Sequence, residues 1–341
     1  MKLLYIGNFL QSSGKTPPPA EMLLQAWKVI FQVKKVSSIK LSVFRLAHMM
    51  GSVIWGKLNG VNVMIVDVFS SNAFWYAYLV SELGYCLRIP LILVLHGGEL
   101  PTRFRNTPKV SQRLMLYASA IVSPSGYLQH HAHSFSGKLV NIIGNPIQIN
   151  QYLCREKKYF QIHLLWVRSF HQVYRPEMAV NVCKILKNVW PNIQLTMIGP
   201  DKDGSLDKVR KYADSIGLSD NVHFKGLMSK SEWIIESEKA NIFLNTTSVD
   251  NTPVSVIEAL ALGFPVVSTN VGGIPYMLQH EKNALLVKDG DVNEMGEAIK
   301  RIMFETELRD KLIRNGRALA EKMDIKKVSE QWKVLINEVV S

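Results

Sequence analysis

Cysteine is scarce in this sequence of 341 residues, and its scarcity excludes two kinds of architecture. The three cysteines, Cys86, Cys154 and Cys183, show no paired spacing. A disulfide-stapled scaffold and a zinc site built on cysteine pairs are therefore excluded, and a reducing compartment is favoured. Because Met1 leads directly into a strand-like run, we expect no secretory signal and a cytoplasmic protein.

Long apolar runs are also missing. No uncharged segment is apolar enough over the roughly 20 residues that a membrane-spanning helix needs. The longest uncharged stretch, residues 114–137, is rich in Ser, Gly, His and Gln. With 47% apolar and 20% charged residues, the composition is globular, and the length suffices for two domains.

Acidic residues are rare in the first half of the chain. Residues 1–150 hold 14 Lys and Arg against 4 Asp and Glu, whereas the remainder holds 26 against 24. This asymmetry indicates an anionic partner for the first half, either a membrane surface or nucleic acid. A basic face that only keeps the protein soluble is the alternative.

Aromatic residues interleave with this basic charge. Within residues 38–50, Leu41, Phe44 and Met49 are spaced for one apolar face of a helix. We therefore expect residues 38–50 to dock peripherally on the anionic inner face of a membrane. The alternative is that these side chains pack on a sheet. Nucleic acid is disfavoured because no recognised binding motif accompanies the charge. The basic and aromatic residues of this region are Lys28, Lys34, Lys35, Lys40, Arg45 and Lys57, with Trp27, Phe31, Phe44 and Trp55.

A glycine-rich turn follows the first strand-like run and reads "GNFLQSSGKTPPP", residues 7–19. A phosphate-binding P-loop needs a glycine five positions before Gly14, where this chain has Phe9. Pro18 and Pro19 also lack the N–H groups of a continuing helix. A nucleoside triphosphate P-loop is therefore excluded.

Short apolar runs alternate with helical stretches along the whole chain, in two series. The first comprises residues 2–6, 61–66, 91–95, 120–123 and 140–143, and the second 163–167, 194–198, 222–225, 242–246, 265–269 and 284–287. Apolar strands alternating with helices predict an α/β protein with two doubly wound, Rossmann-like domains. We place these at 1–152, joined by a terminal helix at 325–341, and at 153–324. In such sheets ligands bind beyond the carboxyl ends of the strands.

The loop that leaves the run at 242–246 carries the clearest chemical signal. The sequence predicts a helix with Thr252 as N-cap and Pro253 at the first helical position, which is a favourable anion site. Glu258 falls on the same face as Val254, so its carboxylate needs a polar partner. We interpret it as a ligand for hydroxyl groups, with a structural carboxylate as the alternative.

Asp250 and Glu258 have seven residues between them and resemble the E-x7-E motif of retaining glycosyltransferases of family 4, which have the GT-B fold of two Rossmann-like domains around a central cleft. The following "IEALALGFPVVSTNVGGIP" resembles the same family's signature. The resemblance implies that Glu258 binds the nucleotide ribose and Asp250 contacts the donor sugar. It also implies donor contacts from the backbone of Asn251, Thr252, Pro253 and Val254.

Other segments resemble the family in order along the chain. Arg168 after "LLWV" and the less well-placed Arg175 match cations that bind the donor diphosphate. His96 and Gly97 of "HGGEL" match a motif beside the transferred sugar. Gly199, Gly226 and Leu227 lie in loops that match donor-binding loops. Gly14 and Lys15 would face the donor phosphate or the acceptor across the cleft.

Two metal-like patterns fail. Asp201 and Asp203 lack the glycine and the glutamate that a calcium loop needs. The cluster His130, His131 and His133 has no nearby carboxylate, which favours a helix surface.

The resemblance implies a metal-independent hexosyltransferase that uses a UDP- or GDP-linked sugar and no cofactor. Catalysis would rest on His96, Asp250 and Arg168, and the acceptor would be a glycan or lipid-linked hydroxyl of cell-surface polysaccharide, lipopolysaccharide or glycolipid synthesis. Two alternatives stay open, a nucleotide-sugar epimerase of the same fold and a non-catalytic sugar-nucleotide-binding protein.

Overall fold

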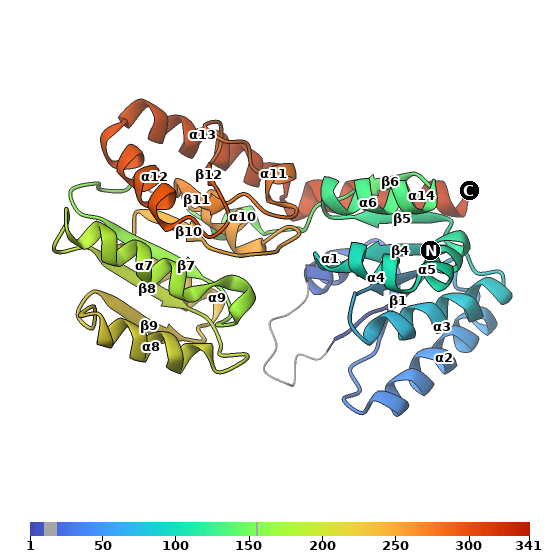
Figure 1. Ribbon diagram of the computed structural model, residues 1–341. Coiled ribbons are helices and arrows are strands. Elements are labelled where there is room, and N and C mark those ends of the chain that lie inside the picture. The colour runs from blue at the N-terminus through green and yellow to red at the C-terminus, as the bar shows by residue number, and fades with distance from the viewer. Residues whose placement is uncertain (10–18, 155) are drawn as a thin grey trace. The chain divides into compact units, whose positions relative to one another are not determined.

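The computed structural model describes residues 1–9, 19–154 and 156–341 (Figure 1). The predicted site residues Gly14 and Lys15 lie outside these ranges. The chain packs into two compact units, which we call unit 1 (residues 1–146 and 323–341) and unit 2 (residues 147–322). The sequence places a boundary after residue 152, but Tyr152 packs within unit 2, where its hydroxyl donates a hydrogen bond to Glu258.

Unit 1 is built on one parallel sheet of six strands in the order β2-β1-β3-β4-β5-β6. Its strands are β1 Lys2–Ile6, β2 Gln32–Val36, β3 Val63–Val68, β4 Leu91–Leu95, β5 Ala120–Ser123 and β6 Val140–Ile142. The sequence analysis misses β2, because "QVKKV" is an edge strand in which only Val36 is buried. An edge strand needs no apolar run, so the pattern gives no signal there.

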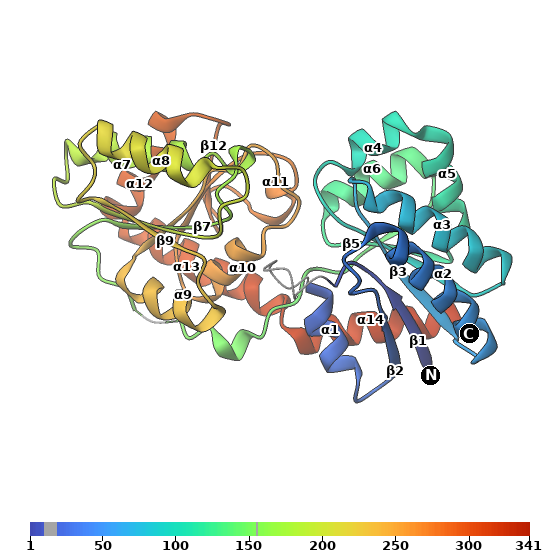
Figure 2. The same ribbon diagram turned by 90° about the horizontal axis from the view of Figure 1, so that it is seen from below.

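Helices cover both faces of this sheet (Figure 2). One face carries α2 Ser42–Leu58, α3 Ala73–Cys86, α4 Leu100–Asn106, α5 Pro108–Tyr117 and α6 Gly126–Ser136. The other carries α1 Pro19–Trp27 and the last helix of the chain, α14 Ile325–Val340. Trp27 and Trp332 join these two helices edge to face, with ring centroids 5.4 Å apart. The chain's last helix therefore completes the core of its first unit.

Unit 2 repeats the architecture, with a parallel sheet in the order β12-β11-β10-β7-β8-β9. Its strands are β7 His163–Val167, β8 Gln194–Ile198, β9 Val222–Gly226, β10 Ile242–Asn245, β11 Val266–Thr269 and β12 Leu285–Val287. Its helices are α7 Pro176–Lys187, α8 Ser205–Ser215, α9 Lys230–Glu236, α10 Val254–Ala261, α11 Ile274–Met277, α12 Val292–Phe304 and α13 Thr306–Lys322. Short 3-10 turns occupy η2 Ile149–Gln151, η3 Gln172–Tyr174 and η4 Ser237–Lys239.

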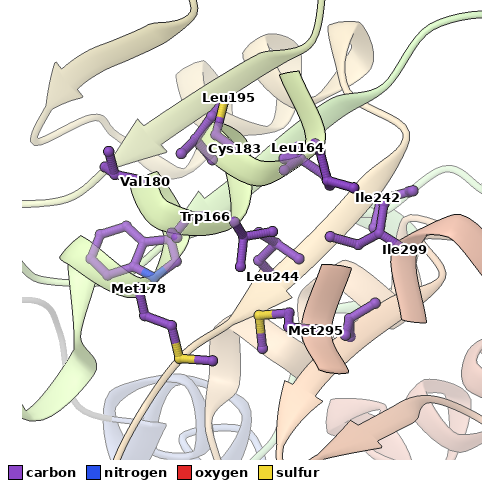
Figure 3. Close-up of a cluster of buried hydrophobic side chains, with 14 of the residues drawn as sticks. Leu164, Trp166, Met178, Val180, Cys183, Leu195, Ile242, Leu244, Met295 and Ile299 are labelled. Carbon is purple, nitrogen blue, oxygen red and sulfur yellow. The ribbon is translucent and has the colours of Figure 1, made fainter. Parts of the chain in front are cut away.

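The largest core of unit 2 lies between its sheet and the helices α7, α8 and α12 (Figure 3). Trp166 of β7 is fully buried there, in one cluster with Met178 of α7 and Met295 of α12. The helices α10 and α13 pack against each other on the opposite face. Burial on both faces explains the near-continuous apolar strands, and the predicted class of two doubly wound parallel sheets is confirmed.

Within residues 1–9, 19–154 and 156–341, no helix combines the length and the apolar character that spanning a bilayer requires.

Candidate functional site

The predicted residues of unit 2 lie at the carboxyl edge of its sheet, where three neighbouring strands end in a row. The amide of Arg168, after β7, donates to the carbonyl of Ile198 at 3.0 Å. The amide of Gly199, after β8, donates in turn to the carbonyl of Gly226, which ends β9, at 2.8 Å. Because strands β7, β8 and β9 are adjacent, three loops far apart in sequence share one edge.

Arg168 and Asp250 form an ion pair at this edge. Each side chain is only 15% exposed. The guanidinium carbon of Arg168 lies 4.7 Å from the ring centroid of Tyr174, and burial lowers the pKa of the arginine. Its Nε is buried and donates no hydrogen bond to any described residue. A buried cation with an unused donor is poised to receive an additional anion.

The loop that carries Asp250 is held by main-chain contacts. The amide of Gly273 donates to the carbonyl of Asp250 at 2.8 Å. Gly272 has φ 53°, and a β-carbon there would collide with the same carbonyl. The group that both glycines approach is the backbone of the loop at Asp250 and Asn251. They position the carboxylate rather than line a pocket.

Gly199 makes a similar close backbone contact with Arg168, the ion-pair partner of Asp250. Its φ is 152°, and a β-carbon at this position would overlap the carbonyl oxygen of Arg168. Only glycine permits the two loops to approach so closely.

Polar residues after β10, whose role the sequence does not reveal, hold the backbone around Arg168 in place. The hydroxyl of Thr246 donates to the carbonyl of Tyr174 at 2.7 Å, and that of Ser248 donates to the carbonyl of Val173 at 2.9 Å. Trp166 Nε1 donates to the Thr246 hydroxyl at 2.9 Å. These bonds tie the loop after β10 to the turn after β7, which places Tyr174 against the guanidinium.

Glu258 lies on α10, the helix that follows the Asp250 loop, and is 4% exposed. The predicted start of this helix is wrong by one residue. Pro253 is the N-cap, with φ −69° and ψ 116°, and Val254 is the first helical residue. The extended ψ of Pro253 leaves it outside the helix, in the N-cap position that the sequence assigns to Thr252. The buried orientation of Glu258 follows the apolar spacing of the helix as expected.

Two residues that the sequence analysis misses hold the Glu258 carboxylate. The hydroxyl of Tyr152 donates to Oε1 at 2.9 Å, and the ammonium of Lys230 forms an ion pair with the same oxygen. Burial and the nearby carboxylate raise the pKa of Tyr152. Oε2 accepts no hydrogen bond from the described residues, so half of the carboxylate is available to a ligand hydroxyl.

Lys230 is held by the start of its own helix. Ser229 and Glu232 form a capping box at the N-terminus of α9, which fixes the position of the lysine between them. A buried glutamate needs a cation or a hydrogen-bond donor as partner. The sequence does not identify this partner, because Lys230 is 28 residues away from Glu258.

Two other residues predicted to bind the sugar nucleotide, Arg175 and Leu227, lie in more exposed surroundings. Arg175 adopts a left-handed backbone with φ 44°, and its guanidinium bonds both carboxylate oxygens of the exposed Asp289, at 2.5 and 3.1 Å. It is therefore already paired away from Arg168. Leu227, after β9, is 62% exposed, while Gly226 has φ 67°.

In unit 1, His96 follows β4 and belongs to a buried polar chain. Its Nε2 lies 2.9 Å from Oδ1 of Asp67, the carboxylate in the otherwise apolar strand β3. Tyr5 donates its hydroxyl to the same oxygen at 2.7 Å, and burial together with Asp67 raises its pKa. Phe69 stacks on the imidazole at 4.9 Å between centroids. The sequence analysis misses Asp67, although a carboxylate within "VMIVDV" is itself the signal.

A small pocket lies beside Asp67, at the carboxyl edge of the unit 1 sheet. Gly7, Asn8, Asp67 and Tyr76 contribute to its lining. The side-chain oxygen of Asn8 is buried and has no hydrogen-bond partner among the described residues. Gly97, next to His96, has φ 88°, which only glycine adopts without strain. Among the described residues, the pocket is therefore lined by one unsatisfied acceptor, on Asn8, and by Asp67, the carboxylate that contacts His96.

Neither pattern that resembles a metal site gathers ligands. Asp201 and Asp203 accept hydrogen bonds from backbone amides at the start of α8. On α6, His131 packs edge-on against Tyr127, and His133 Nδ1 lies 2.9 Å from the carbonyl of Lys138. Among the described residues no three His, Cys, Asp or Glu side chains are arranged to hold a metal ion.

Comparison with known proteins defines the class. The family model for glycosyl transferases group 1 matches residues 155–319, nearly all of unit 2. Unit 2 is therefore similar to the glycosyl transferases of group 1, and the fold of the chain is GT-B-like.

Individual relatives are distant. The amylovoran biosynthesis glycosyltransferase AmsK of Erwinia amylovora is 26% identical over 62% of this chain and 54% of its own length. A GDP-mannose-dependent phosphatidylinositol monomannoside mannosyltransferase of Mycobacterium tuberculosis is 28% identical over 38% of this chain and 33% of its own length. The chain thus spans about half or less of these relatives.

Among solved structures, HepE of Anabaena, crystallised with UDP, superimposes with a TM-score of 0.79 at 16% identity. The superposition covers 99% of this chain and 100% of HepE. This similarity shows the fold of both units.

Proposed function

We propose that this protein is a retaining glycosyltransferase that moves a hexose from a nucleotide-diphosphate sugar to an acceptor hydroxyl. The observation that carries the proposal is the pair of part-satisfied charged groups at the carboxyl edge of unit 2. Within the part of the chain that the structure describes, the buried Nε of Arg168 has no hydrogen-bond partner, and the contacts of Glu258 with Tyr152 and Lys230 both use Oε1, which leaves Oε2 for a ligand. A diphosphate supplies the anion that the first lacks, and a ribose supplies the hydroxyl donors that the second lacks.

Each side chain has a defined task in this reaction. Arg168 stabilises the charge that develops on the departing nucleoside diphosphate, which is the electrostatic role that a metal-independent transfer needs. Glu258 binds the ribose through Oε2 while Tyr152 and Lys230 hold Oε1. Asp250, held by Gly272 and Gly273, contacts the sugar. For unit 1, the proposal assigns His96 to the transfer step, with Asp67 orienting its imidazole.

The donor and the acceptor are proposed from the relatives. HepE has been crystallised with UDP-glucose, and the mycobacterial relative is named for GDP-mannose, so the donor is a UDP- or GDP-linked hexose. The relatives named for amylovoran biosynthesis and for lipopolysaccharide core biosynthesis support an acceptor in cell-surface polysaccharide or glycolipid synthesis.

A thermal-shift panel of UDP-, GDP- and ADP-sugars tests this function, followed by donor hydrolysis and transfer with the stabilising sugar nucleotide. We expect stabilisation by one nucleotide class, slow donor hydrolysis, and transfer with retained anomeric configuration by NMR. Stabilisation without any turnover would favour a binding protein instead. Conversion of the donor sugar without an acceptor would favour an epimerase, and no stabilisation by any sugar nucleotide would overturn the proposal.

A further inference from the structure

The small pocket of unit 1 has no ligand assigned to it so far. It lies where β1 and β3 end, between α2 and the first turns of α3, and these two helices pack side by side on one face of the sheet (Figure 2). The space between its walls, with the open side included, is about 300 Å³. This volume is at the lower limit of ligand pockets and suits part of one sugar rather than an oligosaccharide.

The floor of this pocket is apolar. Met49 of α2, Val66 of β3 and Ala77 of α3 line it, and each is at most 4% exposed. The sequence places Met49 on one apolar face with Leu41 and Phe44, which is wrong, because Met49 is buried here whereas the other two are exposed. A floor of this kind favours an uncharged group of the ligand, such as a methyl group.

Two hydrogen-bond acceptors lie in the wall of the pocket. The side-chain oxygen of Asn8 is buried and has no hydrogen-bond partner in the part of the chain that the structure describes. The contacts of Asp67 with Tyr5 and His96 both use Oδ1, which leaves Oδ2, beside Gly7, for a ligand. Because a buried acceptor without a donor costs free energy, a ligand with an N–H or O–H group is favoured at this wall.

Two hydrogen-bond donors complete the wall. Arg45 donates through Nε and Nη2 to the carbonyls of Ile39 and Lys40, at 2.6 and 2.8 Å, which leaves Nη1 for a ligand. Its guanidinium carbon lies 5.9 Å from the ring centroid of Tyr76, which also lines the pocket and carries a hydroxyl that can donate. A ligand that matches these groups therefore also carries an acceptor, such as a carbonyl oxygen.

We propose that this pocket binds an acetamido group, and that the acceptor of the transfer reaction is an N-acetylated sugar. The inference rests on the proposed glycosyltransferase function and names the substrate class of its acceptor. The amide N–H would donate to Asn8 or Asp67, and the carbonyl oxygen would accept from Arg45 or Tyr76. The methyl group would cover the apolar floor.

The pocket adjoins the histidine that is assigned to the transfer step. Asp67 and Phe69 both line the pocket, and both contact the imidazole of His96. Oδ1 of Asp67 lies 2.9 Å from Nε2 of His96, and the Phe69 ring stacks on the imidazole at 4.9 Å between centroids. An acetamido group bound in the pocket would hold a hydroxyl of the same sugar beside that imidazole, so the pocket would both select and orient the acceptor.

Other small groups match only part of the pocket. A carboxylate or a phosphate would meet Arg45, but it would also face the oxygens of Asn8 and Asp67, which repel it. A hydroxyl group or a water molecule would satisfy these oxygens and leave the apolar floor uncovered. The acetamido group has an N–H, a carbonyl oxygen and a methyl group, one for each kind of lining group.

Acceptor selectivity tests the proposal, with the p-nitrophenyl glycosides of glucose, galactose, N-acetylglucosamine and N-acetylgalactosamine as probes. Transfer from the stabilising donor, followed by mass spectrometry of the product, should have a kcat/KM at least about tenfold higher for an N-acetylated sugar than for its parent hexose. Saturation-transfer NMR should show the strongest saturation on the acetyl methyl protons. The proposal would be overturned if the parent glycosides were used as well as the N-acetylated ones, or if the methyl protons were saturated no more than the ring protons.

Two variants test whether the pocket causes this selectivity. Ala73→Leu adds a larger side chain to a partly exposed lining residue and should lower the preference for the N-acetylated sugar at least about tenfold. Asn8→Ala removes the buried acceptor and should lower the preference about fivefold. The matched controls are Ala26→Leu, at a partly exposed position of α1, and Asn72→Ala, which removes an exposed side chain without a capping bond.

Both controls should keep the preference of the wild type, and circular dichroism melting should show that all four variants stay folded. An unchanged preference in both folded pocket variants would contradict the proposal. Donor hydrolysis by the wild type in the absence of any acceptor measures the proposed function separately. If the donor is hydrolysed and no preference for N-acetylated sugars appears, the acetamido pocket is wrong while the glycosyltransferase function stands.

Discussion

The two units share an architecture but differ in charge. Each has a parallel sheet of six strands with helices on both faces. Unit 1 holds 17 Lys and Arg against 7 Asp and Glu, whereas unit 2 holds 23 against 21. Unit 2 uses its balanced charge in specific ion pairs, while much of the excess in unit 1 is left on the surface. The same frame therefore supports both a charged ligand edge and a basic surface.

The carboxyl edges differ as well. In unit 2 two functional groups are each held by a partner of opposite charge, Arg168 by Asp250 and Glu258 by Lys230. In unit 1 the buried carboxylate of Asp67 joins Tyr5 and His96. The comparison teaches that the sheet determines where loops converge, while the loops determine the chemistry. It predicts that changes in unit 2 affect donor binding and changes in unit 1 affect transfer alone.

The largest effect is expected for Arg168→Ala. Removing a fixed cation that stabilises the leaving group should lower the transfer rate roughly 100- to 1000-fold. Single-turnover transfer from the donor measures this rate. Arg210→Ala, which removes an exposed arginine near Asp207 on α8, is the control and should leave the rate unchanged. A transfer rate within about threefold of the wild type for Arg168→Ala would exclude its proposed role.

Asp67→Asn, in unit 1, tests whether a change in this unit affects transfer without affecting donor binding. Because the imidazole of His96 loses its anionic partner, transfer should fall roughly 10- to 100-fold while donor affinity stays the same. Transfer kinetics and a donor titration by calorimetry separate the two quantities. Tyr5→Phe, which removes only a hydrogen bond to Asp67, should cost less than about threefold in rate. If Asp67→Asn weakened donor binding as much as transfer, the two units would not divide the work as proposed.

Lys230→Met addresses a positioning residue. Without its ion pair the Glu258 carboxylate keeps only the bond from Tyr152, so donor affinity should fall about tenfold. Calorimetry should show this loss, and Lys230→Arg should restore most of the affinity. Lys239→Met breaks another lysine–glutamate pair, with Glu236, and should not change the affinity. Failure of arginine to rescue would argue against a role through charge.

The smallest effect concerns stability and pH. Burial, with the nearby His223, lowers the pKa of His163 to about 4, against about 6.5 in an unfolded chain. Between pH 6.5 and pH 4 the imidazole of His163 is protonated in the unfolded state but neutral in the folded state. The free energy of unfolding therefore falls as the pH drops through this range. After allowance for partial exposure, the loss is about 1 to 2 kcal/mol.

Urea unfolding at pH 7 and pH 5 measures this contribution. The wild type should lose more stability between the two pH values than His163→Gln, which has no titrating group at that position. Equal losses in the two proteins would show that His163 does not contribute.

Sequence patterns predicted the sheets better than the contacts of the site. Buried strands such as β7 are continuous apolar runs and are easily seen, whereas the edge strand β2 with its two lysines is not. The start of α10 was predicted one residue early, because Pro253 fits either the cap or the first turn. Local spacing captures the periodicity of an element, but its ends depend on backbone angles that the sequence does not fix.

Long-range pairing was the main gap. The burial of Glu258 followed from helix periodicity, and its need for a partner followed from burial. The identity of those partners, Tyr152 and Lys230, depends on how the loops meet at the sheet edge. The resemblance suggests Arg175 as a donor ligand, but it does not predict that the guanidinium pairs with Asp289, 114 residues away.

The central claim is that the edge of unit 2 around Glu258 holds the nucleotide sugar, and calorimetric titration of Glu258→Ala with the stabilising donor tests it most directly. Losing the ribose ligand should weaken donor binding about 100-fold or more. Glu297→Ala removes an exposed glutamate of α12 that pairs with Lys300, and it should bind the donor like the wild type. Undiminished donor affinity in a folded Glu258→Ala protein would contradict the account.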